Sequence, residues 1–238
     1  MSLPVFYTKE IPAPHQPLVL DEETSRHVSQ VLRMREGELL QLTDGLGNLY
    51  TAEVTDPHKK RTSVTITDSK NLMRPARHTI IAISLLKNNS RFEWFLEKAT
   101  ELGIREIVPL ICERTERQHF RQDRMQSVLI SAMLQSQQAW LPVLQEPVGA
   151  DVYIKSAKNM IAQKFIAHCM NNGIKSNLHE RINASADGIV LIGPEGDFSV
   201  NEIDLALENG FQPVSLGDTR LRAETAGIVA ATLLTRHI

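Results

Sequence analysis

Short segments in which apolar and polar residues alternate dominate the first seventy residues, and this pattern predicts β-strands. The sequence Asp44–Asn48 is typical of the turn of a hairpin. Apolar residues recur at helical spacing only after Asp21 and Thr24, either of which could be the N-cap, and Gly37 ends that helix. The expected strands are Leu3–Tyr7, Leu18–Leu20, Leu39–Thr43, Leu49–Thr55 and Ser63–Thr67. We therefore expect a small β-barrel with one helix.

The pattern changes after a basic, proline-containing linker at Asn71–Arg77. Nearly continuous apolar runs, typical of strands covered on both faces, then alternate with segments of helical periodicity. The expected strands are Thr79–Leu86, Ile104–Ile111, Lys164–Cys169, Gly188–Ile192 and Pro213–Leu216. This alternation implies a mostly parallel sheet with helices on both faces. We expect an α/β protein of two domains, residues 1–72 and residues 73–238.

Two of the expected helices begin with the spacing of a capping box, Ser90 with Glu93 and Ser199 with Glu202. The first of them has an apolar stripe made of Phe92, Phe95, Leu96, Ala99 and Leu102. Another helix is expected around Met125–Met133. The last runs from about Glu224, and its apolar positions are Ile228, Val229, Leu233 and Leu234. This final helix has more apolar surface than a single terminal helix requires, so we expect a homodimer.

Composition indicates a globular chain, since 42% of the 238 residues are hydrophobic and 23% are charged. Apolar runs fall short of the ~20 residues of a membrane span, so we expect no membrane segment. The start, MSLPVFYTKEIPAP, lacks the basic and apolar stretches of a secretory signal. Cys112 and Cys169 lie far apart in sequence, and no histidines cluster at ligand spacing. We therefore expect neither a metal site nor a disulfide, and a cytoplasmic location.

Charge is distributed unevenly along the chain. The net charge is −2, which argues against a protein held to nucleic acid by bulk positive charge. Between Lys59 and Arg124, however, fourteen Lys and Arg stand against eight Asp and Glu, whereas the remainder has twelve against twenty. Such asymmetry fits either a surface for an anionic partner or ordinary solvated helix faces.

Two glycine-containing loops follow expected strands, and open α/β sheets bind ligands at the carboxyl ends of their strands. The loops are Ile192–Gly196 and Leu216–Ala226. Their glycines let backbone amides approach a ligand, or simply serve tight turns. His168, at the end of a third strand, is the only histidine placed to face such a site. The dinucleotide, P-loop, zinc-protease and nucleophile-elbow motifs are missing, which disfavours those enzyme classes.

Over almost its whole length, the chain resembles the SPOUT methyltransferases, and it is most similar to their 16S ribosomal RNA uridine-N3 methyltransferase family. The matching motifs are Arg26-His27-Val28-x-x-Val31-Leu32-Arg33-Met34-x-x-Gly37, Lys87-x-x-x-Arg91-x-Glu93, Glu97–Gly103, Leu191–Gly196, and Leu216-Gly217 with Leu221-Arg222-x-Glu224-Thr225-Ala226. The resemblance implies a PUA-like N-terminal domain and a C-terminal domain with a deep trefoil knot, which periodicity could not have shown. It also implies a homodimer in which the knot regions pack together.

The resemblance further implies S-adenosylmethionine as cofactor and a uridine of 16S rRNA in the small ribosomal subunit as substrate. The implied cofactor-binding residues are His168, Ile192, Gly193, Pro194, Glu195, Gly196, Leu216, Gly217, Leu221, Arg222 and Ala226. Arg222 and Glu224 are the candidate catalytic residues, because a guanidinium suits carboxylates, phosphates and base edges and a carboxylate could take a proton. The candidate RNA-binding residues are His27, Arg33, Arg35, Lys87 and Arg91.

The sequence departs from the family pattern at three positions. Leu134 and Gln138 stand where related enzymes often carry Glu and Arg around the matching Gln135, and Asp197 stands where many have a second glycine. Two other functions remain open at this point. One is a non-enzymatic RNA-binding dimer, and the other is a methyltransferase with the same cofactor but another substrate.

Overall fold

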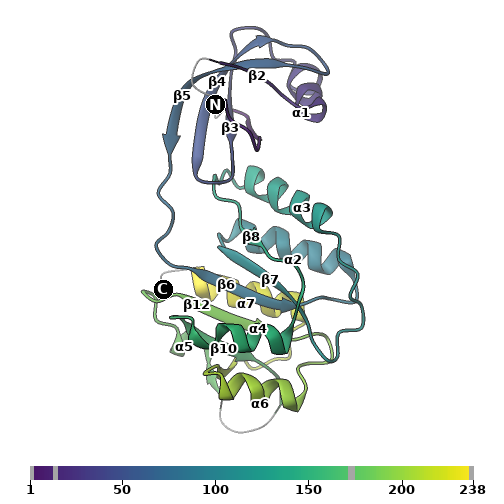
Figure 1. The fold of residues 1–238 in the computed structure, drawn as a ribbon, viewed down its shortest axis with the longest axis vertical. Helices are drawn as coiled ribbons and strands as arrows, with labels where there is room; N and C mark the ends of the chain where they lie inside the picture. Colours follow the sequence, from purple (N-terminus) through teal and green to yellow (C-terminus); the bar gives the residue numbers. More distant parts are fainter. Residues whose placement is uncertain (1–2, 13–15, 171–174, 236–238) are drawn as a thin grey trace. The chain divides into compact units, whose positions relative to one another are not determined.

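The computed structural model describes residues 3–12, 16–170 and 175–235, and it divides into two compact units. Unit 1 comprises residues 1–74 together with Met133–Leu141, and unit 2 comprises Pro75–Ala132 and Pro142–Ile238. Figure 1 shows the elements of both units. Assignment of Met133–Leu141 to the N-terminal unit was not expected from the sequence. No helix in the described ranges has the length and apolar character needed to cross a membrane.

Unit 1 is a curled five-stranded sheet in the order β1-β3-β4-β5-β2, antiparallel except where β1 pairs with β3. Its strands are β1 (Val5–Tyr7), β2 (Pro17–Val19), β3 (Leu39–Thr43), β4 (Asn48–Asp56) and β5 (Ser63–Asn71). The helix α1 (Glu22–Arg26) continues directly into a π-helical turn, η1 (His27–Val31). Asp21 caps α1 by accepting a hydrogen bond from the Thr24 N–H at 2.9 Å. Of the two N-caps that the sequence allowed, the structure has Asp21.

The hairpin turn between β3 and β4 packs against Met133–Leu141, within unit 1. Gly45 and Gly47 have φ of +74° and +89°, conformations that favour glycine. A Cβ on Gly47 would overlap the ring of Trp140, whose Nε1 donates to the carbonyl of Leu72 at 3.1 Å. The turn glycines therefore serve a backbone bend and a close contact at once.

Unit 2 is built on an eight-stranded parallel sheet whose main path is β11-β13-β10-β12-β6-β7-β8, with β9 paired to β7. Its strands are β6 (Thr79–Ser84), β7 (Glu106–Ile111), β8 (Val143–Leu144), β9 (Val148–Gly149), β10 (Gln163–Ala167), β11 (Ser176–Asn177), β12 (Gly188–Ile192) and β13 (Gln212–Ser215). Its helices are α2 (Asn89–Glu101), α3 (Gln122–Gln135, which ends in unit 1), α4 (Ala150–Ser156), η2 (Ala157–Asn159), α5 (Leu178–Arg181), α6 (Val200–Glu208) and α7 (Ala223–Thr235). The expected α/β class is confirmed.

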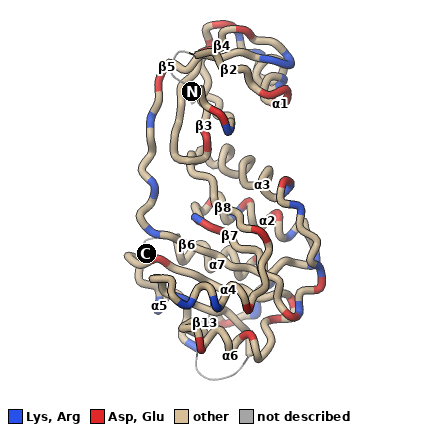
Figure 2. The backbone as a smooth tube through the Cα atoms, viewed as in Figure 1, with Lys and Arg blue, Asp and Glu red and all other residues tan. Residues whose placement is uncertain are grey.

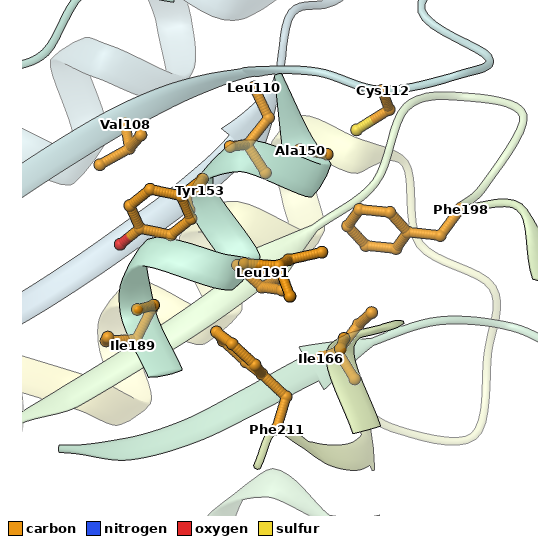
Figure 3. Packing of buried hydrophobic residues seen from close by; sticks show 14 of the residues in the cluster. Val108, Leu110, Cys112, Ala150, Tyr153, Ile166, Ile189, Leu191, Phe198 and Phe211 are labelled. Atoms are coloured by element: carbon orange, nitrogen blue, oxygen red, sulfur yellow. The ribbon is translucent and has the colours of Figure 1, made fainter. Parts of the chain in front are cut away.

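Helices cover both faces of this sheet. On one face, α4 and α6 pack over alternate residues of β6, β7, β10 and β12, with Tyr153, Phe198 and Phe211 filling the core (Figure 3). On the other face, α7 packs against β6, β12 and α2. Gly227 of α7 lies so close that a Cβ there would be 2.6 Å from the Phe95 ring. Strands buried on both faces explain the nearly continuous apolar runs in the sequence.

Of the two capping boxes expected, one is confirmed and the other is wrong. Ser199 caps α6, the Glu202 N–H donating to its Oγ at 3.3 Å and its own N–H donating to Glu202 Oε2 at 2.8 Å. Helix α2 instead begins one residue before Ser90, because Asn88 Oδ1 accepts from the Ser90 N–H at 2.9 Å. Glu93 is drawn to Arg124, with which it forms two hydrogen bonds.

Candidate functional site

A cavity of about 830 Å³ opens at the carboxyl ends of β12, β10 and β13, within unit 2. β10 pairs in parallel with both of its neighbours, Ala167 lying beside Ile192 on one side and Val214 on the other. The three strands therefore end together, and the loops that follow them meet. The lining residues are Ala167, His168, Cys169, Lys175, Ile192–Glu195, Asp197 and the run Val214–Ala223 with Ala226.

The first wall is the loop after β12. Gly193 packs tightly there, since a Cβ would lie 3.0 Å from both the backbone nitrogen and the ring of Phe198. Arg114 fixes the far end of the loop from outside, donating to the carbonyl of Gly196 at 2.8 Å and to that of Phe198 at 3.3 Å. Glu195 Oε1 accepts from the Lys87 N–H at 3.2 Å. Gly196, expected to contact a cofactor, is not part of the lining.

Asp197 lies in the same wall in a left-handed backbone conformation, with φ of +65°. Its Oδ2 accepts from the Cys169 N–H at 2.8 Å, and its Oδ1 accepts from the Phe198 N–H at 2.8 Å. Asp and Asn tolerate this conformation better than other non-glycine residues. Asp197, at the position where the resemblance led us to expect a glycine, therefore takes a conformation that Asp tolerates, and its side chain links the loops after β12 and β10.

The second wall, after β10, contains His168 and Lys175. Lys175 Nζ donates to the carbonyl of His168 at 2.7 Å. The His168 side chain is only 8% exposed, and neither of its ring nitrogens has a hydrogen-bond partner among the described residues. Burial lowers the pKa of His168, and repulsion from Lys175 lowers it further, while Asp197 opposes both. A buried polar ring without a partner, at a cavity wall, is suited to a ligand that supplies the missing hydrogen bond.

The third wall is the loop between β13 and α7. Gly217 has φ of +136°, a conformation nearly restricted to glycine, and a Cβ there would meet no atom within 4 Å. Leu216, Leu221, Arg222 and Ala226 line the cavity as expected. The Arg222 side chain is exposed and has no ion pair within the part of the chain that the structure describes. A guanidinium at the rim of the cavity is thus available to a bound anion or base edge.

Glu224 lies one residue inside α7 and does not line the cavity. It is 7% exposed, and its Oε1 lies 3.7 Å from Nε of Arg91, a loose ion pair. Its Oε2 is buried with no hydrogen-bond partner among the described residues. Two residues that sequence analysis gave separate roles, RNA binding for Arg91 and catalysis for Glu224, are therefore joined in one contact.

The remaining RNA-binding candidates are exposed. In unit 1, Leu32 ends the π-helical turn, and Arg33 follows it with a φ of +55°. Both π-helical turns and residues with strained backbones are frequent at functional sites. Arg35 is exposed nearby, and His27 packs edge-on against Phe6 with ring centroids 5.5 Å apart. In unit 2, Lys87 pairs with Glu116 at 2.6 Å.

Basic and acidic residues are mixed along the chain. Figure 2 shows Lys and Arg interspersed with Asp and Glu along both units, and several basic side chains of the Lys59–Arg124 segment are occupied by ion pairs. Within the described ranges, no three His, Cys, Asp or Glu side chains are grouped as they would be around a metal ion.

Two residues of the site had no signal in the sequence. Lys175 lines the cavity because of the course of the loop after β10, and Arg114 supports the cavity from the loop after β7. Asp218 and Arg220 lie in a loop that the sequence singled out, although neither was named as a candidate. The rule that ligands bind beyond the carboxyl ends of strands could have singled out Arg114, but no motif marks it.

Comparison with known proteins places this geometry in a family. Residues 73–235 match the family model described as an RNA methyltransferase domain, and residues 20–67 match an RNA methyltransferase PUA domain. The chain therefore belongs to the RNA methyltransferase family that joins these two domains.

Individual relatives agree over most of the chain. The ribosomal RNA small subunit methyltransferase E of Synechocystis sp. is 32% identical over 208 residues, 86% of this chain and 68% of that protein. The enzyme of the same name from Neisseria gonorrhoeae, solved bound to S-adenosyl methionine, is 31% identical with a TM-score of 0.83, covering 97% and 95% of the two chains. A Porphyromonas gingivalis structure is 36% identical with a TM-score of 0.89, covering 98% of both.

The environment of His168 leads to a prediction about its titration. We expect its pKa to lie below the ordinary value of 6.5, and Lys175→Met to raise it by removing a repelling charge. Asp197→Asn should lower it further, because the Asp197 carboxylate favours the imidazolium. The measurement is an NMR titration of the imidazole resonances, assigned with His168→Gln. Shifts in the same direction in both variants would contradict this electrostatic account.

The same depressed pKa links His168 to stability. Because the folded state favours the neutral ring, His168 contributes to the free energy of unfolding above pH 6.5. This contribution is lost as the pH falls through the pKa of His168 in the folded state. Urea unfolding of the parent chain and of His168→Gln between pH 5 and 8 should therefore diverge on the acidic side, the parent losing more stability.

Proposed function

We propose that this chain transfers the methyl group of S-adenosylmethionine to uracil N3 of a specific uridine in 16S rRNA of the small ribosomal subunit. One observation carries the proposal. Both glycine-containing motifs that resemble the family lie in walls of a single cavity, together with the end of β10. Family membership, and the activity named for relatives that match most of the chain, support the same reaction.

The cavity fits the proposed cofactor in size and chemistry. Its volume of about 830 Å³ lies within the range of pockets that enclose drug-sized ligands. The unpartnered ring of His168 can hydrogen-bond a polar group of the ligand, and the open space beside Gly217 lets a ligand approach the backbone. The lining has acidic side chains, among them Asp197 and Asp218, and basic ones, among them Lys175 and Arg222, which suits a ligand that carries charges of both signs. We propose as cofactor-binding residues the set expected from the sequence. Gly196 would contribute indirectly, because its carbonyl accepts the hydrogen bond from Arg114 that holds the loop after β12.

The bound cofactor would supply an electrophilic methyl group and leave as the neutral thioether. The chain must present N3 of the base to it, and N3 must release its imide proton to water as the new bond forms. Alignment of the reacting groups can lower the barrier by ~7–11 kcal/mol in well-oriented systems. We assign Arg222 to contact cofactor or substrate, since its guanidinium lines the cavity without an ion-pair partner in the described ranges. We assign Glu224 to position Arg91 from its buried site, rather than to meet the base directly.

RNA would be held mainly outside the cavity. We propose that residues 1–72 form the RNA-binding domain and residues 73–238 the methyltransferase domain, with His27, Arg33 and Arg35 on the former and Lys87 and Arg91 on the latter contacting RNA. Arg33 best supports this, because it is exposed and holds a φ of +55°, which is uncommon for its residue type. Recognition of a folded RNA by shape fits a chain whose net charge is −2.

We further propose a cytoplasmic homodimer whose C-terminal regions are knotted and pack together. Ile228, Val229 and Leu233 of α7 are only partly buried within the protomer, and Trp94 of the neighbouring α2 is 43% exposed. A second copy would cover this apolar surface. Two free cysteines fit a reducing compartment.

The reaction itself is tested with small-subunit particles from cells that lack this gene. We expect the purified chain and S-adenosylmethionine to produce one N3-methyluridine per 16S rRNA, detected by mass mapping of nuclease fragments. The same fragment from parental cells should already carry the methyl group, and free uridine should not react. Methylation at another atom or of another macromolecule would contradict the proposal.

Substitutions at two glycines with positive φ distinguish an effect on cofactor binding from an effect on stability. Gly217→Ala must strain or move a cavity loop, whereas Gly210→Ala places the same strain at φ of +84° after α6, away from the cavity. Each should cost about 1–2 kcal/mol in stability. Only Gly217→Ala should raise the Kd for S-adenosylmethionine in calorimetry, by at least about tenfold, a change equivalent to ~1.4 kcal/mol. Equal affinities in the two variants would contradict the assignment of the loop.

Substitutions of basic residues in the two units should affect RNA binding and methyl transfer differently. Arg33→Ala should weaken RNA binding and lower the steepness of its salt dependence by about one unit, with cofactor affinity unchanged. Arg222→Ala should reduce methyl transfer far more than RNA affinity. Lys158→Ala removes an exposed cation just before β10, at the opposite edge of the sheet, and should leave both measurements unchanged. RNA binding by Arg33→Ala at the parental level would show that this surface is not the RNA site.

A further inference from the structure

The two cysteines of the chain are both free, and they lie in opposite environments. Cys112 is 4% exposed, and burial raises the pKa of its thiol to about 12, so this thiol stays protonated. Cys169 is exposed and follows β10 in the second wall of the cavity. A thiol reacts as its thiolate, and only where a reagent can reach it. Of the two cysteines, Cys169 is therefore the one open to chemical modification.

The neighbouring residue, His168, indicates that a ligand occupies this part of the cavity. Its side chain lines the same wall and is more than nine-tenths buried, since 8% of it is exposed. Neither ring nitrogen has a hydrogen-bond partner among the described residues, and buried polar groups are rarely left in that state. Because His168 and Cys169 line one cavity, a group attached to Sγ of Cys169 takes up space that a ligand of His168 needs.

The contacts of the wall hold Cys169 in place but do not select it by charge. Its N–H donates to Asp197 Oδ2 at 2.8 Å, which fixes the backbone at the edge of the cavity. The Lys175 ammonium interacts electrostatically with both Asp197 and Cys169. The ammonium favours a thiolate and the carboxylate opposes it. Exposure, rather than charge, therefore distinguishes Cys169 from Cys112.

We propose that Cys169 is a reversible modification site that takes up a sulfur group from low-molecular-weight disulfides, and that the adduct excludes the cofactor from the cavity. The second part rests on the proposed function. The Cys169 thiolate attacks one sulfur of the disulfide, and the new S–S bond forms as the old one breaks. The departing sulfur keeps the bonding electron pair and takes up the proton that Cys169 lost. Cys169 is thus oxidised, and half of the reagent is reduced to a thiol.

Such an exchange connects the proposed methyl transfer to the redox state of the surroundings. Exposed disulfides are readily reduced, so the adduct forms when small disulfides accumulate and is removed when thiols are restored. The added group lies in the cavity and not in the hydrophobic core, to which the other cysteine, Cys112, belongs. The modified chain therefore stays folded but cannot load its cofactor.

The test uses the full chain and oxidised glutathione as the probe disulfide, and the adducts are followed by intact mass and peptide mapping. Cys169→Ser removes the reactive thiol. A matched variant combines Cys169→Ser with Ser131→Cys, which places an exposed thiol on α3 outside the cavity. Calorimetry gives the Kd for S-adenosylmethionine before treatment, after treatment, and after reduction with dithiothreitol.

We expect one adduct per chain, at Cys169, and none at Cys112. Cofactor at roughly ten times its Kd should slow the modification about tenfold, because only about one chain in eleven is then free to react. The adduct should raise the Kd for S-adenosylmethionine at least about tenfold, equivalent to ~1.4 kcal/mol, and dithiothreitol should restore it. In the matched variant, cofactor should not slow the modification, and the Kd should be the same before and after treatment.

Three results would overturn the inference and leave the proposed function standing. They are the absence of an adduct at Cys169, an adduct there that leaves the Kd of the parent unchanged, and an equal loss of cofactor binding when the thiol at residue 131 is modified. If the untreated parent does not bind S-adenosylmethionine, the proposed function fails, and the second part of the inference fails with it. An adduct at Cys169 would in that case support the modification site alone.

Discussion

The position of β10 between β12 and β13 is the constraint on which the site depends. Parallel neighbours end at the same edge of a sheet, so this pairing gathers three loops that lie more than 20 residues apart in sequence. The cavity follows from backbone arrangement before any side chain contributes. That is why glycines mark two of the walls, Gly193 through contact with Phe198 and Gly217 through its φ of +136°.

A packing contact on the far face of the sheet holds the remaining part of the cavity in place. Gly227 lets α7 approach Phe95 and Ile83 more closely than any residue with a Cβ could. Since α7 begins at Ala223, directly after the loop that forms the third wall, the depth of this contact sets where that wall stands. A buried apolar interaction thereby determines the geometry of a polar site, and a change there would be transmitted through the rigid helix.

Local patterns predicted most elements but not their arrangement. Strands 39–43 and 188–192 have the bounds expected from the sequence. The first has the alternating pattern of a strand with one buried face, and the second has the continuous apolar run of a strand buried on both faces. The two capping-box sequences have the same spacing, and only the structure distinguishes them. In α2, Asn88 is the N-cap in place of Ser90, and the Glu93 side chain accepts hydrogen bonds from Arg124 instead of capping the helix. Sheet order, the joining of Met133–Leu141 to unit 1 and the short helix α4 depend on contacts distant in sequence, which no window of periodicity contains.

The candidate site shows the same limit at the level of single residues. Loops 192–196 and 216–226 could be singled out because a general rule places ligands after strands, and their glycines mark close backbone approach. Lys175 and Arg114 carried no such mark, since their roles come from the loops they reach, not from their neighbours in sequence. Asp197 is the instructive case. The sequence marked it only as a departure from the expected family pattern, whereas its φ of +65° and its hydrogen bond to Cys169 come from the structure. Strain of this kind persists only where the surroundings hold it, so a strained residue bonded across two walls of a cavity is evidence that the separation of those walls matters.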